Sequence, residues 1–265
     1  MDYISRKLAQ NAGSRGPIVL MYHSISNDLD NWKWSLSLVE FERQMDYLKD
    51  AGWNTIRLSD ITKYKESDSK VIAITFDDGY KNNYEAYLIL KKMEMCATWF
   101  VVSEDIGENA RWEDEGMPSD LNLLDENSLK EMHDSGMEIG SHSKTHRNLL
   151  KLTLDNVRVE VQDSKHKIEK IIGEDVVSFA YPYGKFSQEV ASVVQEFGFR
   201  FACSTQSGYG LTGGDLYSIK RLTIYSSDTV GSLARKLAFA DNDAGWKRTF
   251  VYLGNQLFHK IKKLK

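Results

Sequence analysis

The sequence has few of the residues that mark disordered, disulfide-bonded or membrane-spanning chains. Its 265 residues include only 3 Pro and 2 Cys, which excludes a proline-rich chain and a disulfide framework. No apolar run approaches a length of about 20 residues, which a membrane-spanning helix needs. A net charge of -4 disfavours a nucleic-acid-binding protein that neutralises phosphates. What remains is a globular chain of a size that suits one domain with a large core.

The cysteines and the N-terminus bear on the cellular compartment. Cys96 and Cys203 lie in apolar segments without the spacing of a metal site, which predicts buried free thiols. Residues 1–15 lack the apolar stretch of about 7 to 15 residues that a secretory signal needs. We therefore expect a cytoplasmic protein.

Short β-branched runs alternate with helical patterns along most of the chain. A capping box at Ser37 and Glu40 predicts one helix start, and apolar spacing predicts helices over 154–172 and 190–197, each followed by glycine. The alternation predicts an α/β fold with a mainly parallel sheet, either a closed barrel or an open doubly wound sheet. Strands are expected at residues 18–22, 54–58, 71–75, 97–102, 137–140, 176–180, 199–203 and 222–225.

Polar residues follow several of these strands, at the sheet edge where both folds place their chemistry. The adjacent carboxylates Asp77 and Asp78 come after 71–75. Their side chains point to opposite sides, so that one can bind a metal while the other takes a proton; an ordinary turn is the alternative. His142 and His146 follow 137–140, and histidines four residues apart can share one cation.

Two weaker signals follow other strands. The segment 181–184 has the sequence Tyr-Pro-Tyr-Gly, a tight turn that could present the backbone N–H of Tyr183 to a developing oxyanion. His23 follows 18–22, and a lone histidine behind an apolar strand is more often a core residue.

Three of these segments together resemble the polysaccharide deacetylase (NodB homology) family, the family 4 carbohydrate esterases. They are 75–79, 142–146 and 181–184, in the order and spacing of the family, and the resemblance extends from Pro17 to Leu237. It implies a single distorted (β/α)7 barrel over 17–240, with an N-terminal arm at 1–16 and a basic helix at 241–265. It also implies metal-dependent removal of N-acetyl groups from amino sugars.

The resemblance assigns roles by matching position. Asp77 would be the general base, Asp78, His142 and His146 the metal ligands, and Tyr183 the oxyanion donor through its backbone N–H. Among metals, Zn2+ fits this mixed set of nitrogen and oxygen ligands best, with Co2+, Ni2+ or Mn2+ as alternatives.

The chain departs from the usual family pattern at two points. An arginine that orients the base usually begins the third motif, but Ala180 stands there; Arg221 and Arg200 could replace it, the sequence does not choose between them, and Arg221 joins the candidate site. The acid histidine that usually ends a late strand is also absent. However, residues 17–25 resemble the first motif of a permuted branch that includes poly-N-acetylglucosamine deacetylases, which implies that His23 is the general acid.

Elimination supports the same role for His23, because histidine titrates near neutral pH. Two of the six histidines are assigned to the metal. His133 and His166 fall in expected helices and His259 in the basic tail, so that only His23 stands at the catalytic end of a strand.

Aromatic residues near the expected site are candidates for sugar binding. Trp112 lies in the long acidic connection 103–127, and Trp32 and Trp34 follow His23. Each could stack on a sugar or pack against its own barrel. Tyr181 and Pro182 of the third motif complete the expected substrate-binding set.

The C-terminal segment 247–265 has six Lys or Arg and no Asp or Glu, with apolar residues at helical spacing. Such a helix could lie on an anionic membrane or pack on the barrel. In the cytoplasm the acetylated sugar would be a nucleotide sugar or a lipid-linked glycan intermediate, and the basic tail favours the latter.

The sequence thus predicts a metal-dependent carbohydrate N-deacetylase. A carbohydrate-binding protein on a decayed barrel, argued from the missing arginine, and an amidase for a non-sugar amide are the alternatives. Metal content and a screen of acetylated amino sugars against small amides would separate the three.

Overall fold

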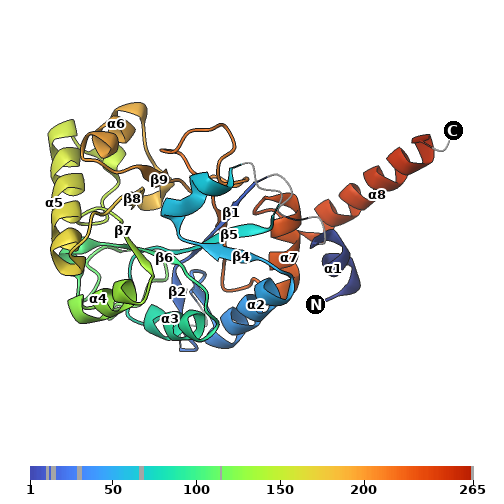
Figure 1. The fold of residues 1–265 in the computed structure, drawn as a ribbon, viewed down its shortest axis with the longest axis horizontal. Helices are drawn as coiled ribbons and strands as arrows, with labels where there is room; N and C mark the ends of the chain where they lie inside the picture. Colours follow the sequence, from blue (N-terminus) through green and yellow to red (C-terminus); the bar gives the residue numbers. More distant parts are fainter. Residues whose placement is uncertain (10–11, 13–15, 29–31, 66–68, 114, 264–265) are drawn as a thin grey trace.

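Parallel strands and outer helices alternate along the chain in this computed structural model (Figure 1). It describes residues 1–9, 12, 16–28, 32–65, 69–113 and 115–263, without the side chains of Ala9 and 255–263. The strands are β1 (Ile18–Tyr22), β2 (Ser24–Ile25), β3 (Ser35–Leu36), β4 (Asn54–Ile56), β5 (Val71–Phe76), β6 (Thr98–Val101), β7 (Glu138–Ser141), β8 (Ser178–Ala180), β9 (Phe201–Cys203) and β10 (Leu222–Thr223).

The α-helices are α1 (Tyr3–Ala9), α2 (Leu38–Asp50), α3 (Asn83–Lys92), α4 (Glu126–Asp134), α5 (Leu154–Ile172), α6 (Gln188–Glu196), α7 (Val230–Phe239) and α8 (Trp246–Lys263). Four short 3-10 helices are η1 (Leu58–Tyr64), η2 (Ser103–Asp105), η3 (Leu149–Lys151) and η4 (Pro182–Gly184).

Eight strands form one parallel sheet. Its order is β10-β1-β5-β6-β7-β8-β9, and β4 pairs with the first half of β5. An isolated parallel bridge between Cys203 and Ile219 joins β9 to the segment that leads into β10. The sheet therefore curls toward a barrel with helices around it, which confirms the predicted α/β fold of (β/α)7 type.

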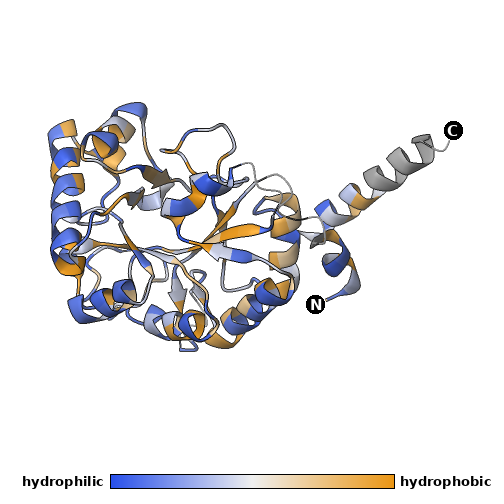
Figure 2. Cartoon of the chain, viewed as in Figure 1, coloured by the Kyte–Doolittle hydropathy of each residue, from blue (hydrophilic) through white to orange (hydrophobic). Residues whose placement is uncertain are grey.

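Side chains of the strands alternate between the barrel interior and the helices. In β1, Ile18, Leu20 and Tyr22 belong to the outer hydrophobic cluster, whereas Val19 belongs to the inner one. Every residue of β1 and β5 is buried, as expected for a sheet covered on both faces. Figure 2 shows hydrophobic residues concentrated in the central strands, with hydrophilic residues on the outer sides of the helices.

Most element boundaries agree with the sequence patterns. Helix α5 spans 154–172 as predicted, and Gly173 ends it with a φ of 77°. The expected strand 54–58 is shorter, because the Leu58 N–H donates to Thr98 Oγ1 at 3.0 Å and η1 begins there.

Both cysteines are free, but Cys96 is only half-buried whereas Cys203 is buried.

Helix α1 and the start of α8 lie on the same side of the molecule (Figure 1). Helix α1, within the expected N-terminal arm, packs on α7, and the Arg235 guanidinium donates to Ser5 Oγ at 2.7 Å. Helix α8 extends away from the barrel. Among the described residues, no helix combines the length and apolar character needed to cross a membrane.

Candidate metal and catalytic site

A pocket of about 460 Å³ opens at the carboxyl ends of the parallel strands. It brings together most of the residues that the sequence singles out, although these lie far apart along the chain. Its lining is Met21, His23, Lys33, Trp34, Asp77, Asp78, Glu115, His142, His146, Tyr183, Gly184, Thr205, Thr223, Tyr225 and Asn242.

Strand alternation explains why these side chains converge. Val19 and Ala73 face the barrel interior, and the period of two carries that direction to His23 and Asp77 just beyond β1 and β5. Ile139 of β7 lies in the outer cluster, which places His142 on the inner side. Strands β1, β5 and β7 thus need no special loop to direct these side chains toward one point.

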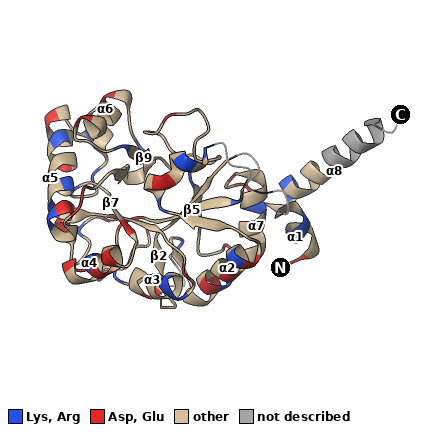
Figure 3. Ribbon diagram, viewed as in Figure 1, with Lys and Arg blue, Asp and Glu red and all other residues tan. Residues whose placement is uncertain are grey.

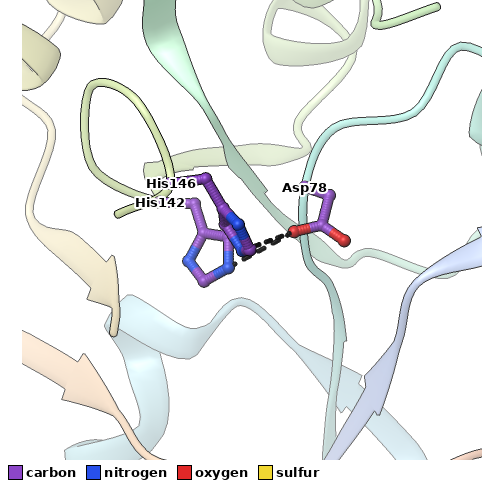
Figure 4. Close-up of side chains that lie close together, drawn as sticks. All are labelled: Asp78, His142 and His146. Atoms are coloured by element: carbon purple, nitrogen blue, oxygen red, sulfur yellow. Dashed lines mark ion pairs between the residues drawn. The ribbon is translucent and has the colours of Figure 1, made fainter. Parts of the chain in front are cut away.

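Asp78, His142 and His146 form a compact, fully buried group (Figure 4). The Nε2 atoms of His142 and His146 lie 3.4 and 3.3 Å from Asp78 Oδ1. One possible ligand atom from each residue lies within 4.8 Å of the others. Three convergent ligands of this kind are typical of a catalytic zinc site.

Hydrogen bonds hold the ring of His142 and the backbone of His146. His142 Nδ1 lies 2.8 Å from the Ala180 carbonyl, so that it donates a proton there and leaves Nε2 as the acceptor. The backbone N–H of His146 donates to Ser143 Oγ at 3.1 Å. Asp78 and His146 adopt left-handed backbone conformations with φ of 72° and 57°, which costs energy and is often associated with functional sites.

Within the described part of the chain, Asp78 Oδ1 is buried without a hydrogen-bond partner. It faces the nitrogen of His142 that holds a lone pair, an arrangement that a cation between them would stabilise. The donor set therefore fits a divalent transition metal such as zinc.

Asp77 points to the other side and meets a buried arginine. Arg221 Nη1 and Nη2 donate to the two Asp77 carboxylate oxygens at 2.6 and 2.7 Å, a bidentate pair. Its Nη1 also contacts Thr75 Oγ1 at 3.2 Å, and its Nε donates to the Ser204 carbonyl at 3.0 Å. Burial raises the pKa of Asp77, but the Arg221 guanidinium outweighs burial and lowers it overall.

The second arginine considered from the sequence lies elsewhere. Arg200 lines a separate pocket with Arg57 and Glu174. Of the two, the structure places Arg221 beside Asp77.

His23 lies half-buried in the same pocket, and its Nδ1 has no hydrogen-bond partner among the described residues. Its ring packs on Trp34 with a centroid distance of 4.3 Å, and Trp34 in turn packs on Tyr225 at 5.4 Å. Burial lowers the pKa of His23, and the carboxylates of Asp78 and Asp77 compensate only in part. The protonated imidazole is therefore a stronger acid than in water.

Tyr183 adopts a left-handed conformation with φ 60° and ψ 10° in the tight turn predicted from the sequence. Its ring lies 4.8 Å from that of His146. The following Gly184 has a φ of 66°, and a Cβ there would lie 2.2 Å from Thr205 Oγ1. Only glycine fits this turn, which keeps Tyr183 at the wall of the pocket.

The expected sugar-binding residues separate into two groups. Trp34 lines the pocket, whereas Trp32 and Trp112 are buried, with 3% and 9% exposure, in a cluster around Tyr80. Trp112 packs on His146 at 4.7 Å between ring centroids, which agrees with the packing alternative.

The third motif needs a correction as well. Tyr181 is fully buried between Phe179 and Phe186, and Pro182 is also buried. Alternation sends Tyr181 to the outer cluster, so its ring lies in the core and does not line the pocket.

The sequence patterns did not reveal Glu160, whose side chain supports the loop that carries the metal-ligand candidates. Glu160 of α5 accepts from the Lys144 and Thr145 N–H groups at 3.0 and 2.8 Å and so fixes the loop between the two histidines. Glu160 stands among the apolar positions Val157 and Val161 of its helix. A carboxylate within an apolar stripe was the signal that could have revealed it.

Comparisons with known proteins agree with this geometry. A family model described as polysaccharide deacetylase matches residues 64–202. YxkH of Bacillus subtilis, a polysaccharide deacetylase by name, is 31% identical over 213 residues, which cover 78% of this chain and 70% of YxkH. The poly-β-1,6-N-acetyl-D-glucosamine N-deacetylase of Staphylococcus aureus is 25% identical over 230 residues, 82% of this chain and 76% of that protein.

A solved structure shows the same fold. The crystal structure of BA0330 from Bacillus anthracis, also described as a polysaccharide deacetylase, has 31% sequence identity and a TM-score of 0.69. The match covers 81% of this chain and 66% of the BA0330 chain.

Proposed function

The chain belongs to the polysaccharide deacetylase family, and we propose that it is a metal-dependent hydrolase that removes N-acetyl groups from amino sugars of a glycan. The observation that carries this proposal is the buried group of Asp78, His142 and His146 beside the Asp77–Arg221 pair in one pocket. The name of the Staphylococcus aureus relative supports an N-acetylglucosamine polymer as the substrate class.

The chemistry sets three requirements. An acetamide carbonyl is a poor electrophile and an amine is a poor leaving group, so hydrolysis needs a deprotonated water, stabilisation of negative charge and a proton donor. A divalent cation held by Asp78, His142 and His146 would polarise the carbonyl and lower the pKa of water.

Asp77 accepts the proton of the attacking water. Arg221 keeps this carboxylate ionised and fixes its plane through two hydrogen bonds. Because Asp77 is buried, the same pair also prevents the carboxylate from rotating away from the pocket. Arg221 is therefore a positioning residue that acts through Asp77.

His23 donates the proton that the departing amine needs. It lies in the same pocket as Asp77, and its lowered pKa makes the imidazolium a strong donor. The backbone N–H of Tyr183 supplies a hydrogen bond to the developing oxyanion, in keeping with its place at the pocket wall.

One alternative loses its main argument. The alternative of a decayed, non-catalytic barrel was argued from the missing motif arginine. However, Arg221 reaches Asp77 from the segment before β10. An amidase acting on a non-sugar amide would use the same residues, so only a substrate screen distinguishes it.

Metal analysis and acetate release together test the proposal. The wild-type protein should contain nearly stoichiometric metal and release acetate from N-acetylglucosamine oligomers, but not from small non-sugar amides. His142→Ala should lose both metal and activity. His133→Ala is the matched control, because His133 lies in α4 outside the pocket. Equal metal content in both variants would exclude the assigned ligands.

We further propose that the enzyme acts on a lipid-linked glycan at an anionic membrane surface. Phe250 and Val251 of α8 are 60% and 59% exposed, close to the cations Lys247 and Arg248. Exposed apolar and basic side chains on one helix are the features that bind such surfaces.

A further inference from the structure

A second pocket, of about 390 Å³, lies directly beside the catalytic one. The two share Tyr183, which lines both. Its other lining residues are Arg147, Asn148, Lys151, Leu152 and Lys185. Arg147 immediately follows the metal-ligand candidate His146, so the basic pocket lies within reach of a glycan bound at the catalytic pocket.

The charge of this basic pocket is of one sign. Three of its six lining residues are cations, and none is Asp or Glu. Arg147, Lys151 and Lys185 form no salt bridge with any carboxylate in the part of the chain that the structure describes. Elsewhere most pocket cations are paired, as Lys144 is with Asp163 at 2.8 Å.

Nearby carboxylates do not neutralise these cations. Arg147 also lines a neighbouring pocket that contains Glu104, Asp105 and Glu160. Asp105 and Glu104 pair with Arg111, and Glu160 accepts hydrogen bonds from the backbone of 144–145. The positive charge of the basic pocket is therefore left for a ligand, although the whole chain has a net charge of -4.

The reaction product limits what that ligand can be. Removal of an N-acetyl group leaves an amine, which is protonated at neutral pH. A stretch of glycan that has already lost several acetyl groups would be repelled by three cations, whereas a phosphate or carboxylate would be attracted. Arginine and lysine together suit such an anionic group.

We infer that the basic pocket is a substrate subsite that binds an anionic group, a phosphate or a carboxylate, carried by the glycan near the acetylated sugar. This inference rests on the proposed function for its choice of glycan. It predicts that the enzyme prefers an acetylated glycan with negative charge close to the reacting residue.

The experiment compares N-acetylglucosamine oligomers of several lengths in three forms: neutral, with a terminal phosphate, and with a terminal carboxylate. Calorimetry measures binding to the wild-type protein, and acetate release gives kcat/KM. Lys151→Glu/Lys185→Glu should reduce the preference for anionic over neutral oligomers about fivefold or more, and the preference should weaken with salt. Both lysines are exposed, so that the variant should keep the wild-type Tm.

Lys92→Glu/Lys170→Glu is the charge-matched control, because both are exposed lysines near the ends of α3 and α5 and line neither pocket. Preference for the phosphate form alone or the carboxylate form alone supports the subsite and identifies its ligand. Equal binding of neutral and anionic oligomers, or the same change in Lys92→Glu/Lys170→Glu, overturns it. If no oligomer releases acetate, the proposed function fails, while calorimetry still decides whether the pocket binds anions.

Discussion

At the scale of single residues, the pocket depends on buried charges that neutralise one another. Arg221 has 0% exposure and Asp77 2%, and neither could be buried alone without a large desolvation cost. The pair connects two distant parts of the chain, since Arg221 precedes β10 and Asp77 follows β5. Its loss should therefore affect both stability and catalysis.

Arg221→Met should lower the free energy of unfolding by about 3 to 5 kcal/mol, because it leaves Asp77 buried without its partner. Since the folded pKa of Asp77 lies below 3.8, its stabilising effect is complete above the unfolded pKa and is lost as the pH falls through the folded value. The deficit of the variant should therefore be largest at neutral pH and shrink in acid. Urea unfolding of the wild-type protein and the variant at neutral and at acidic pH measures this deficit.

Two variants control this prediction. Arg200→Met should change stability by less than about 0.5 kcal/mol, because Arg200 is exposed. Arg221→Met/Asp77→Asn should recover part of the loss, since it removes the unpaired charge. An equal deficit for Arg200→Met would show that the effect is not specific to the pair.

His23→Ala should retain metal and fold but lose activity by a factor of about 10² to 10⁴, as expected for removal of a positioned acid. A substrate with a good leaving group needs little protonation and should lose much less. Comparison of kcat for an acetylated amino sugar and an activated acetyl ester measures the difference. Turnover near the wild-type rate on the amino sugar would show that another group is the acid.

At the scale of elements, one helix supports the metal loop from outside. Glu160 of α5 accepts from the N–H groups of Lys144 and Thr145, which lie between His142 and His146. Charged acceptors make the stronger hydrogen bonds in proteins. Groups behind metal ligands commonly affect metal affinity without contacting the metal.

Glu160→Ala should weaken metal affinity about tenfold or more, although the side chain is not a ligand candidate. Competition with a chelator measures the affinity. Asp163→Ala is the control on the same helix, because Asp163 contacts the same loop only through its exposed pair with Lys144, which contributes little. If both variants keep the wild-type affinity for the metal, the hydrogen bonds from the loop to Glu160 do not contribute to metal binding.

The elements also show what sequence patterns could and could not predict. Periodicity gave α5 and its terminal Gly173, since these depend on local spacing. The Ser37 and Glu40 capping box was half right: Ser37 accepts from the Glu40 N–H at 3.3 Å, but Glu40 Oε1 accepts from Val230 at the start of α7. That partner is distant in sequence, so a local motif could not reveal it.

The distinction between local patterns and contacts that are distant in sequence applies to the site as well. Asp78, His142 and His146 could be singled out because each follows a strand in a parallel sheet. The choice of Arg221 over Arg200 could not be made, because it depends on how β9 and β10 meet. Tyr181 was misplaced because a motif position says nothing about which face of the strand a side chain takes.

At the scale of the whole molecule, acidic and basic side chains are mixed over most of the surface, whereas the sequence of 247–265 contains only basic ones. Figure 3 shows acidic and basic residues interspersed on α2, α4 and α5. Helix α8 begins against α7, where the Arg235 guanidinium lies 4.5 Å from the Trp246 ring centroid and Arg248 pairs with Asp241 at 2.9 Å. From there it extends away from the barrel, opposite α5 (Figure 1).

This arrangement predicts that α8 binds anionic membranes. The wild-type protein should sediment with anionic vesicles at low salt, and deletion of 250–265 should abolish sedimentation. Phe250→Ser/Val251→Ser should weaken sedimentation, since two exposed apolar side chains would no longer enter the interface.

Leu88→Ser/Val159→Ser is the matched control for the loss of exposed apolar side chains, because these residues are 41% and 48% exposed on α3 and α5. All variants should release acetate from soluble oligomers at the wild-type rate, since no α8 side chain that the structure describes lines either pocket. If the wild-type protein stays in solution with such vesicles at every salt concentration, α8 has another role, and the lipid-linked substrate loses its structural support.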